Sequence, residues 1–323
     1  MLVESSAKGA FKKRGVMGLL RYWFQRMTNM AMLEDQVSTL QYFTYEYFKQ
    51  QGFTVQQIPK AEGPLRDLQV CDTILLEIFD AACRKHHLEY CLDVGTLLGA
   101  VRHGGFIPWD DDTDVFMMRE EYERALPILK TELEPYGIDV DEQALRIGVG
   151  YRNRETGIWI DIFAKDYVST DKDRPEEVAA YLDHYWKYRR GITGKVYSMS
   201  REKERKLRRK CMPEICAKED AKSIIDSLEW PPGKGPVIFH VDDYFPLKPI
   251  RFEGIELMGP NRPEECMKCL FGENYMGFPG SGVMHHSDDT SNIANWAADH
   301  GIDMQQMKRE LEEILGRIRK EIE

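Results

Sequence analysis

The stretch PWDDDTDVFM, residues 108–117, places four aspartates within five positions, directly after a Pro-Trp pair. DDTDVFM is expected to form a strand, on which Asp112 and Asp114 project from the same face, about 7 Å apart. Carboxylates on one face repel each other, so a fold that keeps them together needs a compensating positive charge. A divalent cation such as Mg²⁺ or Mn²⁺ supplies it, because these ions prefer carboxylate oxygens and leave other positions to water or phosphate.

A solvated acidic turn is the alternative interpretation, and two features argue against it. Gly95 and Thr96 open a predicted helix after a strand, and a glycine at such a turn lets free helix N–H groups approach a phosphate. Asp161 interrupts the apolar strand GIWIDIF, where an unpaired charge is costly. A metal shared with Asp112 and Asp114 is the simplest partner for it. The sequence therefore predicts a metal site of the kind that handles nucleotides.

The composition limits the class of protein. A chain of 323 residues that is 42% hydrophobic can bury the core of one large domain or of two modest ones. The net charge of -10 argues against a sequence-independent nucleic-acid binder, which needs a broad basic surface. No long apolar run and no secretory signal are recognised, and the seven cysteines, an odd number, fit a reducing compartment. We expect a cytoplasmic protein.

Apolar periodicity predicts helices and strands in alternation. Helices are expected over 33–48, 68–82, 95–103 and 119–133, and strands over 90–94, 111–117 and 157–163, which together describe an α/β core. Further helices are expected over 175–190, 201–210 and 262–275, and a Pro-bounded turn with a short strand over 244–260. Met304, Met307, Leu311, Ile314, Ile318 and Ile322 form an apolar stripe of a C-terminal helix, which would pack on the domain or on a second subunit of a homodimer.

Three segments allow a functional interpretation beside a structural one. Residues 11–27 mix basic and aromatic side chains, as a helix on an anionic membrane surface does, although a core helix or a disordered arm fits as well. The basic run 201–210 is interpreted as a solvated helix face, with contact to a phosphate-bearing partner as the alternative. The third candidate is a set of four cysteines, which could bind one zinc ion, although core packing is the favoured interpretation. These are Cys211, Cys216, Cys266 and Cys269.

The segment LEYCLDVGTLLGAVRHGGFIPWDDDTDVFMMREEY, followed further along by IWIDIF, closely resembles the LicD family. This family belongs to the nucleotidyltransferase-fold superfamily typified by DNA polymerase beta, and fukutin and the fukutin-related protein are distant relatives. The weaker elements FEG, GENYM and FP extend the resemblance over residues 65–287. It implies an α+β fold with a mixed sheet flanked by helices. We expect a catalytic domain over 61–290, between an N-terminal helical arm, 1–60, and a C-terminal helix, 291–323.

The resemblance also assigns roles to the residues of the predicted metal site. Gly95 and Thr96 match the superfamily's turn that holds the nucleotide phosphates, with threonine in place of serine. Asp112 and Asp114 match the paired metal-binding aspartates, and Asp161 matches the third carboxylate. The resemblance thus implies Mg²⁺ or Mn²⁺ as the cofactor.

The substrate side is assigned in the same way. Asp110 matches a further aspartate, expected to orient the acceptor hydroxyl or to bind a second metal. Arg102 and His103 match the loop that faces the donor, and Trp109 of the Pro-Trp corner is placed with them. The sequence GSGVMHHSDD, residues 280–289, stands where the family has a basic stretch before a histidine, and this departure affects the acceptor side.

LicD enzymes move phosphocholine from CDP-choline to a sugar hydroxyl of a cell-surface glycan or its lipid-linked precursor, and relatives move ribitol phosphate from CDP-ribitol. The resemblance therefore implies a transferase that uses a CDP-linked donor, releases CMP and modifies a glycan such as lipopolysaccharide or teichoic acid. A choline group would need an aromatic cage, for which Tyr151, Trp159, Tyr185 and Trp186 are available. The alternatives are transfer of NMP from an NTP and a binding protein without turnover.

Overall fold

The computed structural model describes residues 47, 50–143, 146–152, 157–195, 198–226, 228, 235–278, 297 and 300–322. The predicted arm 11–27, nearly all of the predicted helix 33–48 and the stretch 280–289 lie outside these residues. The chain divides into two compact units, residues 1–57 with 277–284, and residues 58–276 with 285–323. In the first unit, the short helix η1 (Val55–Gln57) follows Phe53, whose ring stacks on Phe278 at 6.1 Å between centroids.

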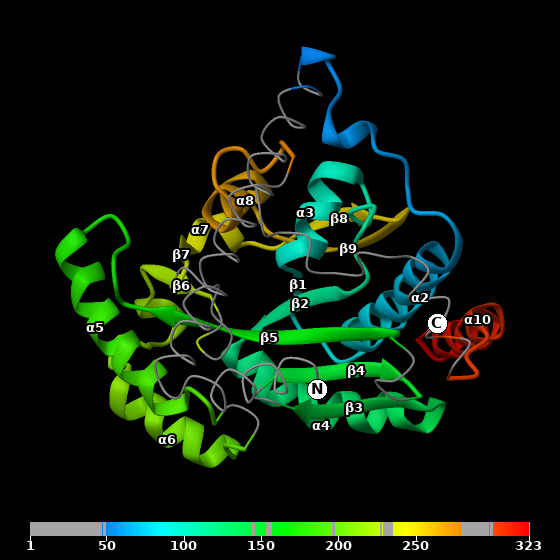
Figure 1. The fold of residues 1–323 in the computed structure, drawn as a ribbon. Coiled ribbons are helices and arrows are strands. Elements are labelled where there is room, and N and C mark those ends of the chain that lie inside the picture. The colour runs from blue at the N-terminus through cyan, green and yellow to red at the C-terminus, as the bar shows by residue number, and fades with distance from the viewer. Residues whose placement is uncertain are drawn as a thin grey trace, which may run out of the picture. The chain divides into compact units, whose positions relative to one another are not determined.

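The second unit is built on a mixed sheet (Figure 1). Its described residues form seven strands in the order β1-β2-β5-β4-β3, with β6 paired to β5 and β7 to β6. The strands β2 and β5 run parallel, and the other neighbours are antiparallel. The bounds are β1 (Cys91–Leu92), β2 (Thr113–Met118), β3 (Ile138–Gln143), β4 (Arg146–Tyr151), β5 (Trp159–Val168), β6 (Ser223–Ile225) and β7 (Ile238–His240).

Helices pack on this sheet and on each other. Helices α2 (Gly63–Lys85) and α4 (Arg119–Leu133) contact β5 and one another, and α3 (Val94–His103) contacts β2. The C-terminal helix α10 (Met304–Ile322) lies along α2 (Figure 1). The remaining elements are η2 (Glu134–Tyr136), α5 (Pro175–Ile192), α6 (Arg201–Cys211), η4 (Lys218–Asp220), α7 (Val241–Tyr244), β8 (Lys248–Phe252), β9 (Ile255–Gly259) and α8 (Pro263–Phe271).

The predicted α+β class, a mixed sheet flanked by helices, is confirmed. The stripe of the C-terminal helix is buried at Met304, Met307, Leu311, Ile314 and Ile318, and this helix packs on α2 of the same chain. The predictions missed the strands β3, β4, β6 and β7. The segment 244–260 contains a hairpin of two strands, β8 and β9, where one short strand was expected.

The cysteine and membrane interpretations also have outcomes in the described residues. Cys211 and Cys266 are buried, Cys216 and Cys269 are half-buried, and these four do not form a metal-binding group in the part of the chain that the structure describes. Core packing is thus the role that the structure gives to the two buried thiols. Within the described ranges, none of the helices combines the length and the apolar character needed to cross a membrane.

Candidate metal and donor site

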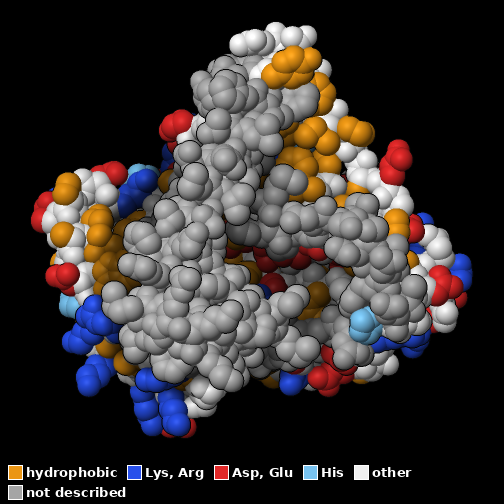
Figure 2. Space-filling model, in the orientation of Figure 1, with side chains coloured by type: hydrophobic (Ala, Val, Ile, Leu, Met, Phe, Trp, Pro, Cys, Tyr) orange, Lys and Arg blue, Asp and Glu red, His pale blue; other side chains and the backbone are white. Residues whose placement is uncertain are grey.

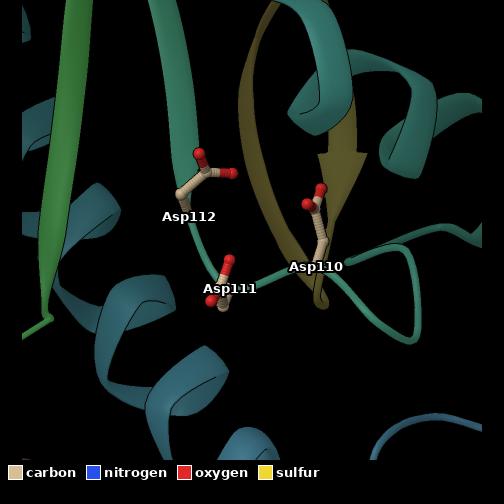
Figure 3. Close-up of side chains that lie close together, drawn as sticks. All are labelled: Asp110, Asp111 and Asp112. Atoms are coloured by element: carbon tan, nitrogen blue, oxygen red, sulfur yellow. The ribbon is translucent and has the colours of Figure 1, made fainter. Parts of the chain in front are cut away.

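Three consecutive aspartates form the tightest acidic group of the described residues. One carboxylate oxygen each of Asp110, Asp111 and Asp112 lies within 4.8 Å of the others. Figure 3 shows Asp110 and Asp111 on the loop that leads into β2, and Asp112 where the strand begins. Asp110 is buried and the other two are half-buried. Asp111 was not predicted as a site residue, because the predicted strand 111–117 would have turned its side chain to the face opposite to Asp112 and Asp114. The strand begins only at Thr113, which leaves Asp111 on the loop.

Asp114 and Asp161 lie side by side on the neighbouring strands β2 and β5. They are register partners in the parallel pair, so both side chains project from the same face of the sheet. Burial raises the pKa of Asp114 well above its ordinary value, and the charges of Asp112 and Asp161 raise it further. The charges of Asp112 and Asp161 thus act on Asp114, and this mutual repulsion is the property that a divalent cation relieves. Among the described residues, however, the carboxylates whose oxygens all lie within 4.8 Å of one another are those of Asp110, Asp111 and Asp112, and not the predicted set of Asp112, Asp114 and Asp161.

Asp161 was expected to have a partner, and within the protein it has two, Trp159 and Arg146. Its Oδ1 accepts a hydrogen bond of 2.8 Å from the indole N–H of Trp159. Its Oδ2 lies 2.6 Å from Nη1 of Arg146, which begins β4. Sequence analysis missed Arg146 because the pairing of β4 with β5, which brings the two residues together, was not predicted.

The turn at Asp93–Thr96, which we call the glycine turn after Gly95, is hydrogen-bonded to the backbone of Asp114. The hydroxyl of Thr96 accepts the N–H of Asp114 at 2.8 Å, and the N–H of Asp93 donates to the carbonyl of Asp114 at 3.0 Å. Val94, between Asp93 and Gly95, has a φ of 40°, which is a strained conformation for a β-branched residue. The first turn of α3 is therefore fixed against the strand that presents the aspartates, and the hydroxyl hydrogen of Thr96 stays available for donation.

The buried Lys165 forms an ion pair with Asp93, the first residue of the glycine turn. Nζ of Lys165 lies 3.0 Å from Oδ2 of Asp93 and 2.6 Å from Oδ1 of Asp226, and the lysine is fully buried. Burial alone would lower the pKa of Lys165, but the two carboxylates outweigh it and raise the pKa above its ordinary value. Burial raises the pKa of Asp93 to about 6, against the opposing effect of Lys165. Lys165 and its two partners, Asp93 and Asp226, were not singled out from the sequence, because isolated charged residues in different segments form no recognisable pattern.

Arg102 and His103 bind each other at the end of α3. Nε of Arg102 donates to Nε2 of His103 at 3.0 Å, and Nη1 donates to the carbonyl of Tyr275 at 3.0 Å. The guanidinium lies 6.0 Å from the ring centre of Trp109. Burial lowers the pKa of Arg102 to about 10, which leaves it charged at neutral pH, with Asp110 favouring the charge. Burial, and then the charge of Arg102, lower the pKa of His103 to about 4.

Residues of α2 and of the β8–β9 turn hold the loop between α3 and β2. Nε2 of Gln69 donates to the carbonyl of Asp110 at 2.9 Å. Glu253, of the FEG element, accepts the N–H of Phe106 at 3.1 Å and pairs with Lys60 and Arg66. The two weaker elements FEG and GENYM thus have structural roles, since Tyr275 of the latter binds Arg102.

Asp72 of α2 is a further carboxylate that sequence analysis missed. Its Oδ1 accepts the N–H of Trp159 at 3.0 Å, whereas its buried Oδ2 has no hydrogen-bond partner among the described residues. Burial raises the pKa of Asp72 well above its ordinary value, and the charges of Asp112 and Asp111 raise it further. An orphaned buried oxygen beside an all-oxygen donor set is what a hard divalent cation would satisfy. The residues present therefore fit Mg²⁺ or Mn²⁺.

Of the four aromatic residues considered for a choline cage, the structure places Trp159 beside the aspartates. Tyr151 donates its hydroxyl to Glu310 of α10. Tyr185 and Trp186 belong to α5, where Tyr185 is part of a separate hydrophobic cluster. Tyr185 and Trp186 therefore lie in another part of the unit. Tyr151 follows Gly150, the register partner of Trp159, so its side chain projects from the opposite face of the sheet.

The basic run 201–210 forms α6 and is not wholly a solvated face. Figure 2 shows Lys and Arg side chains gathered over α5 and α6. Arg208, however, is buried and lies 2.9 Å from Glu204 and 3.4 Å from Asp166. A cavity of about 320 Å³ at this end of β2 and β5 is lined by arginines and glutamates in similar number, at the opposite ends of the strands from the aspartates. It is therefore not the metal site.

Comparison with known proteins identifies relatives for the central part of the chain. Residues 87–155 match the model of the LicD/FKTN/FKRP nucleotidyltransferase domain. The lipopolysaccharide cholinephosphotransferase LicD of Haemophilus influenzae is 35% identical over 122 residues, which are 33% of this chain and 46% of the relative. The match to the domain model includes the glycine turn, Asp110, Asp112 and Asp114, and ends before Asp161.

Two further relatives have no described activity. An uncharacterized protein of Rickettsia typhi is 47% identical over 49 residues, 14% of this chain and 16% of the relative. An uncharacterized protein of Rickettsia prowazekii is 33% identical over 91 residues, 25% of this chain and 34% of the relative. The chain thus spans about half the length of the first relative that it matches, and less of the other two.

Proposed function

We propose that this chain, whose residues 87–155 match the model of the LicD/FKTN/FKRP nucleotidyltransferase domain, is a LicD-type, metal-dependent transferase that moves phosphocholine from CDP-choline to a sugar hydroxyl of a glycan. The acceptor is proposed to be a cell-surface glycan, such as lipopolysaccharide or teichoic acid, or its lipid-linked precursor. The relative from Haemophilus influenzae is a lipopolysaccharide cholinephosphotransferase, which supports both the transferred group and the acceptor class.

The observation that supports this proposal most is the register of Asp114 against Asp161. It places two carboxylates on one face of the sheet, next to Asp112, and the glycine turn is bonded to the backbone of Asp114. Asp112, Asp114 and Asp161 would hold Mg²⁺ or Mn²⁺. When bound, the ion would neutralise the donor diphosphate and the leaving CMP.

The chain's own residues position the donor. The hydroxyl of Thr96 and the free N–H groups of the first turn of α3 donate hydrogen bonds to phosphate oxygens. Arg102 adds positive charge at the far end of the same helix. Trp109 and Trp159 offer aromatic faces to the trimethylammonium group of choline, which aromatic rings attract.

Asp110 acts on the acceptor. Its carboxylate accepts the proton of the sugar hydroxyl as the hydroxyl oxygen bonds to the distal phosphorus of the donor. The bond between that phosphorus and the bridging oxygen breaks, and CMP leaves with the electron pair. Asp111, next to Asp110, extends the acidic group, so that a second cation bound by the pair is the alternative role for Asp110.

We place this activity in the cytoplasm, at the inner face of the membrane. The free cysteines Cys71, Cys83 and Cys91, all buried, fit a reducing compartment. Residues 11–27 are proposed to bind anionic lipid headgroups and bring the enzyme to a lipid-linked acceptor. Deletion of 11–27 tests this, because it should abolish salt-sensitive vesicle binding and leave turnover of a soluble acceptor unchanged.

A donor panel tests the proposed function. The full chain is incubated with a choline-free glycan and CDP-choline, CDP-ethanolamine, CDP-glycerol or CDP-ribitol, and CMP release is followed with Mg²⁺ or with EDTA. We expect Mg²⁺-dependent CMP release with CDP-choline as the preferred donor. CMP release that EDTA leaves unchanged would contradict the metal site, and pyrophosphate release from CTP in place of CMP release would show a nucleotidyltransferase.

A further inference from the structure

Arg146 forms an ion pair with Asp161, whose carboxylate is proposed as the third metal ligand. Its Nη1 lies 2.6 Å from Oδ2 of Asp161, while Oδ1 of Asp161 accepts the indole N–H of Trp159 at 2.8 Å. The side chains of Arg146 and Asp161 are 24% and 13% exposed. Both oxygens of Asp161 are therefore engaged by protein donors.

The ion pair lies on the face of the sheet that carries the aspartates. Asp161 is the register partner of Asp114 on β2 and of Gly148 on β4. Because Gly148 has no side chain, nothing at that position separates Arg146 from Asp161. The guanidinium thus compensates part of the negative charge that Asp114 and Asp161 concentrate there.

A divalent cation and the guanidinium of Arg146 would compete for the carboxylate of Asp161. A cation that binds Asp161 through Oδ2 must displace the guanidinium, and one that binds nearby is repelled by it. The guanidinium is a planar fork that pairs with phosphate oxygens in two parallel hydrogen bonds, and its partial exposure leaves it access to a ligand over the same face. A donor diphosphate offers such oxygens.

We propose that Arg146 is a donor-binding residue that pairs with Asp161 until the donor's diphosphate takes its place as partner. This rests on the proposed function, since it assumes that a cation and a nucleoside diphosphate bind at the aspartates. Transfer of the guanidinium to phosphate frees Asp161 for the cation, and cation binding to Asp161 frees the guanidinium for phosphate. The two ligands therefore bind cooperatively, and each raises the affinity for the other by the same factor.

Manganese binding to the full chain tests the proposal without turnover. Free Mn²⁺ is measured by electron paramagnetic resonance in titrations with and without CDP, and the Mn²⁺–CDP complex in solution is subtracted. The variants are Arg146→Met, Arg146→Lys and the control Arg152→Met. Arg152 directly follows the other end of β4 and pairs with Glu310, so the control removes one positive charge beyond the end of the strand that is far from the aspartates.

In the wild type, CDP should raise Mn²⁺ affinity about tenfold. Arg146→Met should bind Mn²⁺ about tenfold more tightly than the wild type without CDP, and CDP should raise its affinity by clearly less than it raises that of the wild type. Arg146→Lys keeps the charge without the fork, so it should bind Mn²⁺ alone as the wild type does and lose part of the gain from CDP. Arg152→Met should match the wild type in both titrations.

Three results would overturn the proposal. They are an Arg146→Met protein that binds Mn²⁺ no more tightly than the wild type, an equal change in Arg152→Met, and a full gain from CDP in Arg146→Met. If Arg146→Met does not fold, as its melting curve would show, an unchanged gain from CDP in Arg146→Lys overturns it. Absence of Mn²⁺ binding in every protein, with and without CDP, would instead contradict the proposed metal site.

Discussion

The carboxylate of Asp110 lies against the α-carbon of Gly95. A Cβ built on Gly95 would be 2.9 Å from Oδ2 of Asp110, closer than such atoms approach in proteins. Glycine at the start of α3 therefore leaves room for the observed position of a side chain fifteen residues later in the chain. The helix N-terminus proposed to bind phosphate and the aspartate proposed to act on the acceptor are positioned by the same contact.

Gly95→Ala should separate activity from stability. The added methyl group pushes the Asp110 carboxylate aside, and a displacement of about 1 Å at a reacting group can lower turnover about 100-fold. The fold should change little, because a short carboxylate can rotate away. The control is Gly316→Ala in α10, where a Cβ meets nothing within 4 Å. This variant should keep full turnover and gain about 0.5–1 kcal/mol in stability. Equal activity of the two variants would contradict the account of Gly95.

Asp114→Asn should lower the turnover rate by several orders of magnitude and stabilise the metal-free protein. The amide cannot replace the carboxylate as a metal ligand. It carries no charge, however, so it ends both the cost of burying the carboxylate and the repulsion from Asp112 and Asp161, which together raise the pKa of Asp114. Transferase rates with Mg²⁺ and melting temperatures in EDTA measure the two effects. Asp183→Asn, on the exposed face of α5, serves as the control. Full turnover of wild type in EDTA, or of Asp114→Asn with Mg²⁺, would refute the metal site.

Lys165→Met should destabilise the protein by about 3–5 kcal/mol, since it leaves the buried carboxylates of Asp93 and Asp226 without their cation. Adding Asp93→Asn and Asp226→Asn should restore most of this stability, because the buried charges are then gone. Lys206→Met, which breaks a pair between two side chains that are each 75% exposed, should change stability by less than about 0.5 kcal/mol. Urea denaturation compares these proteins, and an equal loss from both single variants would contradict the role given to the buried pair.

His103 should make the protein less stable in acid. The folded pKa is lowered to about 4 from the ordinary 6.5, so between these values the unfolded chain binds more protons and stability falls as pH falls. Protonation also removes the lone pair that accepts the hydrogen bond from Arg102. Between pH 6.5 and 4, wild type should lose about 1–2 kcal/mol relative to His103→Gln, after allowance for the partly exposed ring. Parallel pH dependences of the two proteins would show that His103 does not titrate in this window.

Local patterns were enough to predict the elements that surround the aspartates. Helix α4 and the first half of strand β5 follow from periodicity, because each buries one regular face, whereas strand β2 is buried on both faces and follows from its short apolar run. Strand β4 could not be predicted in the same way. Its sequence RIGVGY has glycines where side chains would show the alternation, and the ring of Trp159 occupies the place of a Cβ on Gly150. The three-residue strands β6 and β7 are too short to show a period.

The site was predictable where its residues share a segment. Asp112 and Asp114 lie two positions apart in one segment, so the strand period predicts a common face for them, although β2 begins only at Thr113. Arg146 reaches Asp161 only through the pairing of β4 with β5, and Asp72 approaches the aspartates from α2. The ion pair of Lys165 with Asp93 was equally unpredictable, because it joins strand β5 to the residue before α3 and depends on how these two elements pack. Such contacts are set by the tertiary fold and leave no local pattern.

The most direct test of the account follows the two phosphorus atoms of the donor. CDP-choline with ³³P in the cytidine-side phosphate and ³²P in the choline-side phosphate is incubated with the full chain, Mg²⁺ and a choline-free glycan. The account predicts that ³²P enters the glycan and that ³³P is released as CMP, in wild type and not in Asp114→Asn. Transfer of ³³P to the glycan with release of ³²P-phosphocholine would contradict it, because attack would then fall on the other phosphorus.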